Sequence, residues 1–149
     1  MLFVGGRIQT QRTDQGDQKM RAAEINKWIK EGGDLPEDLT KEEKEYLEEL
    51  GVKISEKWFE NGQKHYVESW INGQRHGKWE GWYENGQRYC VKYWINGQEH
   101  GKWEEWFENG QKRYEMSFIC GMEHDTKKRW NNNGALLLHE EYYYGNKIG

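Results

Sequence analysis

The segment HGKWEGWYENGQR at residues 76–88 is one copy of a repeat, because most of it returns at residues 100–112 as HGKWEEWFENGQK. Its Asn-Gly pair belongs to a series with a period of 24 residues: Asn61, Asn85, Asn109 and Asn133. A second series, in which each residue is followed by glycine, runs through Asn72, Asn96, Cys120 and Tyr144. Residues 54–149 therefore divide into four units, at 54–77, 78–101, 102–125 and 126–149.

Each unit has the pattern of one β-hairpin. Asn-Gly between alternating aromatic segments favours a type I′ turn, in which both central residues have positive φ. We expect the ENGQ segments to close the hairpins and the longer NGQRHG and NGQEHG segments to link them. A single hairpin is marginal in water, so neighbours must stabilise one another. The predicted fold is mainly β with N-terminal helices: an open antiparallel sheet of about four stacked 24-residue β-hairpins.

Aromatic residues hold fixed positions in the units, and strand alternation assigns them to faces. Trp79 and Tyr83 share one face, whereas Glu80, Trp82 and Glu84 share the other. The column of Trp79 and Trp103 is missing from the outer units, as expected of a core between hairpins. The other column persists in all four units: Trp58, Trp82, Trp106 and Trp130. We therefore expect one aromatic column to form a thin core and the other to lie on a face with carboxylates.

Residues 1–53 lack the repeat and predict a helical cap with a flexible start at residues 9–16. One helix begins after Thr40, which forms a capping box with Glu43, and ends before Gly51; its apolar stripe is Tyr46, Leu47 and Leu50. An earlier helix runs from about Gln18 to Glu31, with Ala22, Ile25, Trp28 and Ile29 on one side.

Repeat arrays need capped ends. We expect the Thr40 helix to cover the first hairpin. Unit four is expected to form a polar cap at the other end, through Lys127, Lys128, Asn131 and Asn132.

Composition narrows the function classes. The chain of 149 residues has a formal net charge of −4, and neither half is basic, which argues against binding to nucleic acid or anionic lipid. No apolar run is long enough for a membrane span, and MLFVGG is too short for the apolar core of a signal peptide. Two cysteines make no disulfide framework, so Cys90 and Cys120 are expected to be reduced in a cytoplasmic protein.

The repeat resembles the MORN-type repeats, and is most similar to the variant MORN repeats of bacterial YwqK-family antitoxin proteins. The positions that carry the likeness, with their 24-residue equivalents, are Gly77, Lys78, Trp79, Trp82, Tyr83, Asn85, Gly86, Trp94, Asn96, Gly97 and Gly101. The likeness covers residues 54–149 and departs from the pattern at Cys120 and Asp125. It implies stacked hairpins and a binding role. In the bacterial group the implied role is neutralising a toxin, and in the eukaryotic group it is scaffolding and lipid association.

Catalytic and metal chemistry find little support in the residue pattern. His76, His100 and His124 occupy equivalent positions of successive hairpins. Neighbouring hairpins are two strand spacings apart, about 10 Å, which is too far for these side chains to bind one zinc ion. The column of Glu60, Glu84 and Glu108 faces Lys64, Arg88 and Lys112 across the tight turn, which predicts cross-strand charge pairs. Cys90 replaces bulky residues of other units and is expected to be a buried small hydrophobe. We expect no enzyme activity, cofactor or metal.

The persistent tryptophan column has two interpretations: packing between hairpins, or a surface for a partner. The candidate partner-binding residues are Trp58, Glu60, Trp82, Glu84, Trp106, Glu108 and Trp130. We expect a bacterial or phage antitoxin, immunity protein or inhibitor that occludes a toxin or defence effector, and an acidic face would suit a basic partner. A peripheral lipid-associated MORN scaffold and a carbohydrate-binding module remain as alternatives.

Overall fold

The computed structural model describes residues 14–149, with side chains placed from residue 22 onward. Of the predicted flexible segment 9–16, residues 9–13 lie outside the described range. Residues 14–16 form the beginning of the first helix. The elements are α1 (Asp14–Glu31), α2 (Lys41–Glu49), β1 (Val52–Trp58), β2 (Lys64–Ile71), β3 (Gln74–Arg75), β4 (Gly77–Trp82), β5 (Arg88–Ile95), β6 (Gln98–Trp106), β7 (Lys112–Ile119), β8 (Met122–Trp130), β9 (Leu136–Tyr143) and β10 (Asn146–Lys147).

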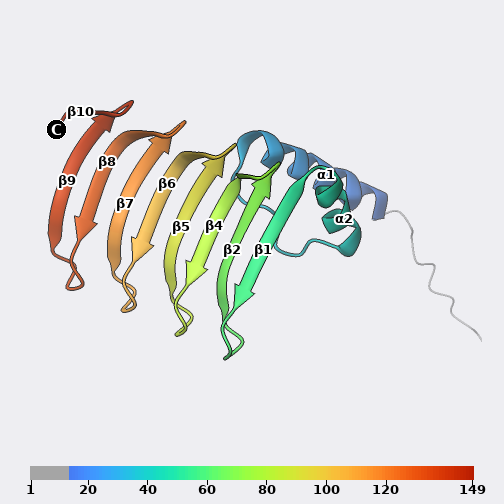
Figure 1. Cartoon of the computed structure of the whole chain (residues 1–149), viewed down its shortest axis with the longest axis horizontal. Helices are drawn as coiled ribbons and strands as arrows, with labels where there is room; N and C mark the ends of the chain where they lie inside the picture. The colour runs from blue at the N-terminus through green and yellow to red at the C-terminus, as the bar shows by residue number, and fades with distance from the viewer. Residues whose placement is uncertain (1–13) are drawn as a thin grey trace, which may run out of the picture.

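All ten strands form one antiparallel sheet in chain order, which confirms the predicted fold class (Figure 1). The four predicted hairpins are β1–β2, β4–β5, β6–β7 and β8–β9. The short strand β3 pairs only with β2, and β4 pairs with β2 further along. β3 and β4 together therefore correspond to the single long strands β6 and β8 of later units.

The two Asn-Gly series form different turns: the ENGQ segments close the hairpins as predicted, but they do not have the predicted type I′ geometry. Positive φ at two successive residues occurs at Asn72-Gly73 and at its three equivalents, so the type I′ turns belong to the links between units. In the ENGQ turns only the glycine has positive φ, and Gly62 N–H donates to the Phe59 carbonyl. This is the pattern of a three-residue loop with a glycine bulge.

Asparagine side chains connect each ENGQ turn to the next. Asn85 Oδ1 accepts from the backbone N–H of Gln87 in its own turn, and Asn85 Nδ2 donates to the Glu108 carbonyl of the following turn. Asn61 and Asn109 bond in the same way to the carbonyls of Glu84 and Asn132. These bonds form an asparagine ladder along one end of the sheet, with one rung between each pair of neighbouring units.

We expect Asn85→Ala to lower the free energy of unfolding by about 1 kcal/mol, because two hydrogen bonds of a central rung are lost where water can partly replace them. Urea denaturation followed by circular dichroism measures this. Asn133→Ala is the matched control, since the described residues offer no acceptor to the Asn133 amide nitrogen, and it should change stability by less than about 0.5 kcal/mol. Equal losses in both variants would contradict the ladder's contribution.

The helices pack on one face of the sheet at its β1 end (Figure 1). The Thr40 oxygen accepts from the Glu43 N–H and the Glu43 carboxylate accepts from the Thr40 N–H, which confirms the capping box. Leu47 of α2 joins Ile25 and Trp28 of α1 and Val52 of β1 in a buried cluster. Tyr46 and Leu50 of the predicted apolar stripe are exposed, so Leu47 is the one residue of α2 that is buried.

One close contact fixes α1 on the sheet. Gly77 has φ of +80°, and a Cβ placed there would lie 2.5 Å from Nε1 of Trp28. Trp28 is 2% exposed, so its indole ring lies directly against the backbone at the start of β4. The equivalent Gly101, in β6, has φ of +65° but only ordinary contacts, because no helix residue lies against it. Asp125 of β8 occupies the same backbone conformation, with φ of 62°.

Unit four is not the polar cap that the sequence predicted. Its last strands expose large apolar side chains: Leu136, Leu137, Tyr143, Tyr144 and Ile148. Lys127 and Lys128 lie in β8, inside the sheet, where Lys127 pairs with Glu123 at 3.0 Å. The prediction failed because it considered only the first strand of the hairpin, whereas β9 and the short β10 that pairs with it form this end of the sheet.

Candidate binding cleft and tryptophan row

The sheet has two faces of different character. The helix face carries Val52, Ile54 and Glu80 and is covered by α1 and α2 beside β1 to β4, whereas β6 to β10 extend beyond the helices (Figure 1). The open face carries Trp79, Trp94 and Trp103. The rings of Trp94 and Trp103 lie 4.9 Å apart, and Trp103 continues to Phe118 at 4.8 Å. This row forms the thin aromatic core between hairpins that the sequence predicted.

Cations fill the spaces between the aromatic rings of the open face. Arg75 lies 5.4 Å from the Trp79 ring and 5.2 Å from Trp94, while Lys92 lies 5.2 Å from the Trp79 ring and pairs with Glu105 at 2.8 Å. Such cation–π contacts each contribute about 0.5–1 kcal/mol at exposed sites. The open face is thus held together by its own side chains, without a covering helix.

The predicted tryptophan row lies on the helix face. Trp58, Trp82, Trp106 and Trp130 end the strands β1, β4, β6 and β8, each just before an ENGQ-type turn. Trp58 is 57% exposed, and the other three are half-buried. Lys64 lies between two of these rings, 5.3 Å from Trp58 and 5.7 Å from Trp82. The row is therefore accessible, and a lysine rather than a neighbouring ring lies against Trp58 and Trp82.

The predicted charge pairs across the tight turn do not form. Glu60, Glu84 and Glu108 lie exposed in the turns. Their expected partners turn back along the strands instead. Arg88 pairs with Glu80 at 2.8 Å, and Lys112 pairs with Glu104 at 2.7 Å and with Glu115 at 2.6 Å. Glu80, Glu104 and Glu115 on the face of the row are thus neutralised by arginine and lysine, whereas the glutamates of the turns stay unpaired among the described residues.

Glu104 and Glu115 share two lysines. Burial acts to raise the pKa of each carboxyl group, but hydrogen bonds and charge from Lys112 and Lys102 outweigh it, so both pKa values lie below the ordinary 4.5. An unfolded chain then binds more protons than the folded one as pH falls. This cluster contributes stability above about pH 4.5, which is lost as pH falls through the lowered pKa values.

We therefore expect the urea midpoint of the protein to fall between pH 6 and pH 3, and to fall less in a Glu104→Gln/Glu115→Gln double variant. Fluorescence-detected unfolding at several pH values measures the difference. Glu45→Gln is the control, because Glu45 pairs only with Lys41 on the exposed surface of α2. A double variant with the same acid sensitivity as the wild type would contradict this assignment.

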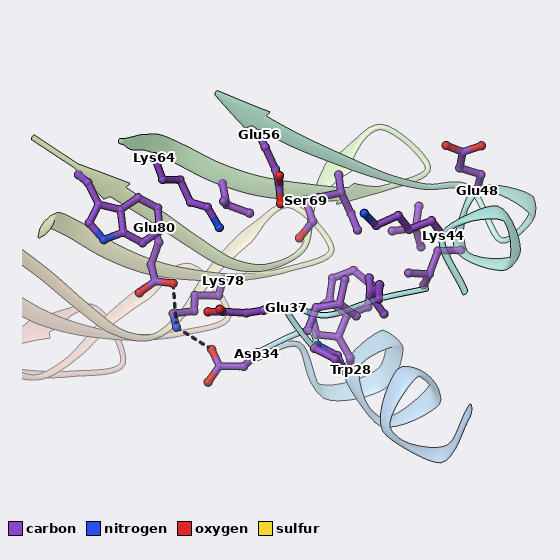
Figure 2. A pocket seen from close by; sticks show the side chains of 18 residues that line it. Trp28, Asp34, Glu37, Lys44, Glu48, Glu56, Lys64, Ser69, Lys78 and Glu80 are labelled. Atoms are coloured by element: carbon purple, nitrogen blue, oxygen red, sulfur yellow. Dashed lines mark ion pairs between the residues drawn. The ribbon is translucent and has the colours of Figure 1, made fainter. Parts of the chain in front are cut away.

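A cleft of about 450 Å³ opens between the helix face and the segment that links α1 to α2 (Figure 2). The linker and α2 form one wall, and β1, β2 and β4 form the other. Its apolar lining is Trp28, Leu35, Pro36, Leu39, Leu47, Val52, Ile54, Val67 and Trp82. Trp82 belongs to both the cleft and the tryptophan row, so the two features are continuous.

Lys78 joins the two walls of the cleft. Its ammonium lies 3.2 Å from Asp34 of the linker and 3.0 Å from Glu80 of the same strand, as the dashed lines in Figure 2 mark. Burial acts to lower the Lys78 pKa, but hydrogen bonds and charge from Glu80 and Asp34 outweigh it and raise the pKa above 10.5. The backbone N–H of Lys78 also donates to the Gly33 carbonyl.

The three histidines of the repeat have different environments. His76 is 1% exposed, and its Nε2 lies 2.8 Å from the Trp28 carbonyl, 48 residues away, so it links the start of β4 to α1. Nδ1 accepts from the Asn96 N–H, which assigns the proton to Nε2. His124 accepts only from the Tyr144 N–H. No group of metal-ligating side chains is found among the residues that the structure describes.

Cys90 lies buried on the open face and Cys120 is exposed in a type I′ turn, and both are free thiols. Burial raises the pKa of the Cys90 thiol to about 11, which keeps it protonated at neutral pH. Cys90 thus occupies the position of a small core residue, as predicted.

Sequence reasoning placed the tryptophan row but missed the cleft. Leu35, Pro36 and Leu39 lie in the linker between the two helical patterns. Their apolar character was the one feature of the sequence that could have indicated a cleft there. Comparison of the chain with protein-family models, with curated proteins and with solved structures finds no match. Within residues 14–149, neither helix has the length and apolar character needed to cross a membrane.

Proposed function

We propose that this chain is a cytoplasmic, non-catalytic protein-binding module, which acts as a stoichiometric antitoxin, immunity protein or inhibitor by occluding a partner. The observation that carries the proposal is the tryptophan row, which extends along the helix face beyond the helices, so that Trp106 and Trp130 lie where neither helix covers the sheet (Figure 1). Half-buried tryptophans with neighbouring charges are typical of the residues that dominate protein interfaces.

The rigidity of the sheet supports the same function. The asparagine ladder and the aromatic core of the open face hold neighbouring hairpins in a fixed register. A partner that binds across several units then pays little ordering entropy, which favours affinity. The resemblance of residues 54–149 to the variant MORN repeats of YwqK-family antitoxins agrees with a binding role, and the exposed acidic turns favour a basic partner.

The test is to isolate the tagged protein from its native host and to identify retained proteins and their stoichiometry by mass spectrometry. We expect one protein at a fixed ratio, whose retention falls at least about tenfold in Trp106→Ala. Tyr142→Ala is the control, because Tyr142 lies on the open face over Lys127. Circular dichroism checks that both variants fold. Equal retention by the wild type and Trp106→Ala, or no stoichiometric protein, contradicts the proposal.

A further inference from the structure

The cleft beside the tryptophan row has an apolar interior and a charged lining. Its volume of about 450 Å³ lies in the range of pockets that receive one ligand or one or two side chains. Five carboxylates and three lysines line it: Asp34, Glu37, Glu48, Glu56, Glu80, Lys44, Lys64 and Lys78. The lining therefore carries a formal excess of two negative charges.

Most of the cations in the cleft already have partners. Lys78 lies between Asp34 and Glu80, and Lys64 lies over the rings of Trp58 and Trp82. Only Lys44, at the exposed surface of α2, has no partner within the described part of the chain. Apart from Lys44, the lysines of the cleft are therefore not free to neutralise its remaining carboxylates.

Unlike most of the lysines, three carboxylates of the cleft have no partner among the described residues. Glu37 of the linker and Glu56 of β1 line opposite walls of the cleft (Figure 2), and neither has a hydrogen bond or ion pair in residues 14–149. Glu48, near the α2 end, is also unpaired among these residues. An arginine side chain that entered between the walls would meet carboxylates on both sides, and its planar guanidinium suits two such acceptors.

We propose that this cleft receives an arginine side chain, with an adjacent apolar residue, from the protein partner. The apolar neighbour packs on Leu35, Leu39 and Ile54, while the guanidinium binds Glu37 and Glu56. This inference rests on the proposed protein-binding function and adds the chemistry of the anchoring residue. Trp82 joins the cleft to the tryptophan row, so one partner segment covers both.

The probe is the tripeptide acetyl-Leu-Arg-Leu-amide, titrated into the full chain and followed by the backbone amide signals in two-dimensional NMR. Two matched peptides replace arginine by citrulline, which has the same shape without charge, or by glutamate. We expect saturable shifts at Leu35, Leu39 and Glu56 with the arginine peptide, and a dissociation constant at least about tenfold weaker for citrulline. The glutamate peptide should not bind.

Glu37→Gln and Glu56→Gln should each weaken arginine-peptide binding by about three- to tenfold, with a larger loss in the double variant. Glu49→Gln on α2, which does not line the cleft, is the control and should bind as the wild type does. Equal binding of the citrulline peptide, preference for the glutamate peptide, or shifts confined to other surfaces would each overturn the proposal. So would a concentration-dependent dimer that Glu56→Gln dissociates, because the occupant would then be a second copy.

These outcomes are independent of the test of the proposed function. Suppose that a partner is retained through Trp106 but the cleft does not bind the arginine peptide. This result would refute only the proposal that the cleft receives arginine. A cleft that binds the arginine peptide, together with no stoichiometric partner, would refute the antitoxin or inhibitor function and leave the peptide site standing.

Discussion

Gly77→Ala should lower the free energy of unfolding by about 3 kcal/mol. Part of this loss is backbone strain, because an L-residue at φ of +80° is disfavoured by about 1–2 kcal/mol. The rest is steric, because the new methyl group would lie 2.5 Å from Nε1 and 2.8 Å from Cε2 of Trp28. Forcing a buried ring to move in a packed core costs about 1–3 kcal/mol. Urea denaturation followed by circular dichroism measures the sum.

Gly101→Ala separates the two contributions. Its φ is +65°, but its Cβ would lie 3.7 Å from Cβ of Tyr93, an ordinary contact. We expect this variant to lose only about 1 kcal/mol, in line with the natural occurrence of Asp125 at the third equivalent position. If both alanine variants lost the same amount, α1 would not be fixed by the contact between Trp28 and Gly77.

His76→Phe should lower the free energy of unfolding by about 3 kcal/mol, although phenylalanine nearly preserves the shape of the ring. The substitution removes both ring nitrogens, which leaves the Asn96 N–H without its acceptor and takes one donor from the Trp28 carbonyl. Losing the bond to the Trp28 carbonyl, which keeps the Gly32 N–H as a donor, costs about 0.5–1.5 kcal/mol, and leaving the Asn96 N–H without an acceptor costs about 1–3 kcal/mol. The edge-on contact with Trp28, with ring centroids 4.9 Å apart, would persist.

The matched control is His100→Phe in the next unit. His100 is half-buried and has no hydrogen bond in the described structure, so we expect a loss below about 1 kcal/mol. Thermal unfolding and urea denaturation of the two variants measure the difference. A loss at position 100 as large as the loss at 76 would show that the repeat itself, rather than α1, makes use of the histidine.

The sequence predicted those features that depend on local pattern. The unit length, the antiparallel order and the capping box at Thr40 follow from residues close together in the chain, and each is present. Alternation also separated Trp79 from Trp82, because side chains of a strand alternate between faces. The predictions therefore succeeded wherever one strand or one helix end decided the outcome.

The errors arose where the same residues meet different surroundings. Asn-Gly adopts a type I′ turn after Ile71, where the loop has two residues, and a bulged turn after Phe59, where it has three. The loop length follows from strand register, which the dipeptide does not encode. Lysine and arginine are long enough to reach several carboxylates, so alternation alone did not identify Glu80 as the partner of Arg88.

The burial of His76 and the formation of the cleft both depend on the helices, so the repeat pattern alone could not predict them. His76 and His100 belong to the same motif, yet only His76 lies under α1, where it becomes buried and bonds to Trp28. The cleft likewise depends on the path of the linker, which contains Pro36 and no periodic pattern. Both features require the position of one element relative to another.

The asparagine ladder has a consequence for how such a chain can change in length. Each rung reaches forward by one unit, so duplication of residues 78–101 would add two strands and one further rung while every existing rung kept its partner. An insertion of about half a unit would instead bring a link turn to the end of the sheet where an asparagine rung is needed. The array can therefore lengthen during evolution only in whole hairpins, and each added hairpin would extend the helix face by the same step of about 10 Å.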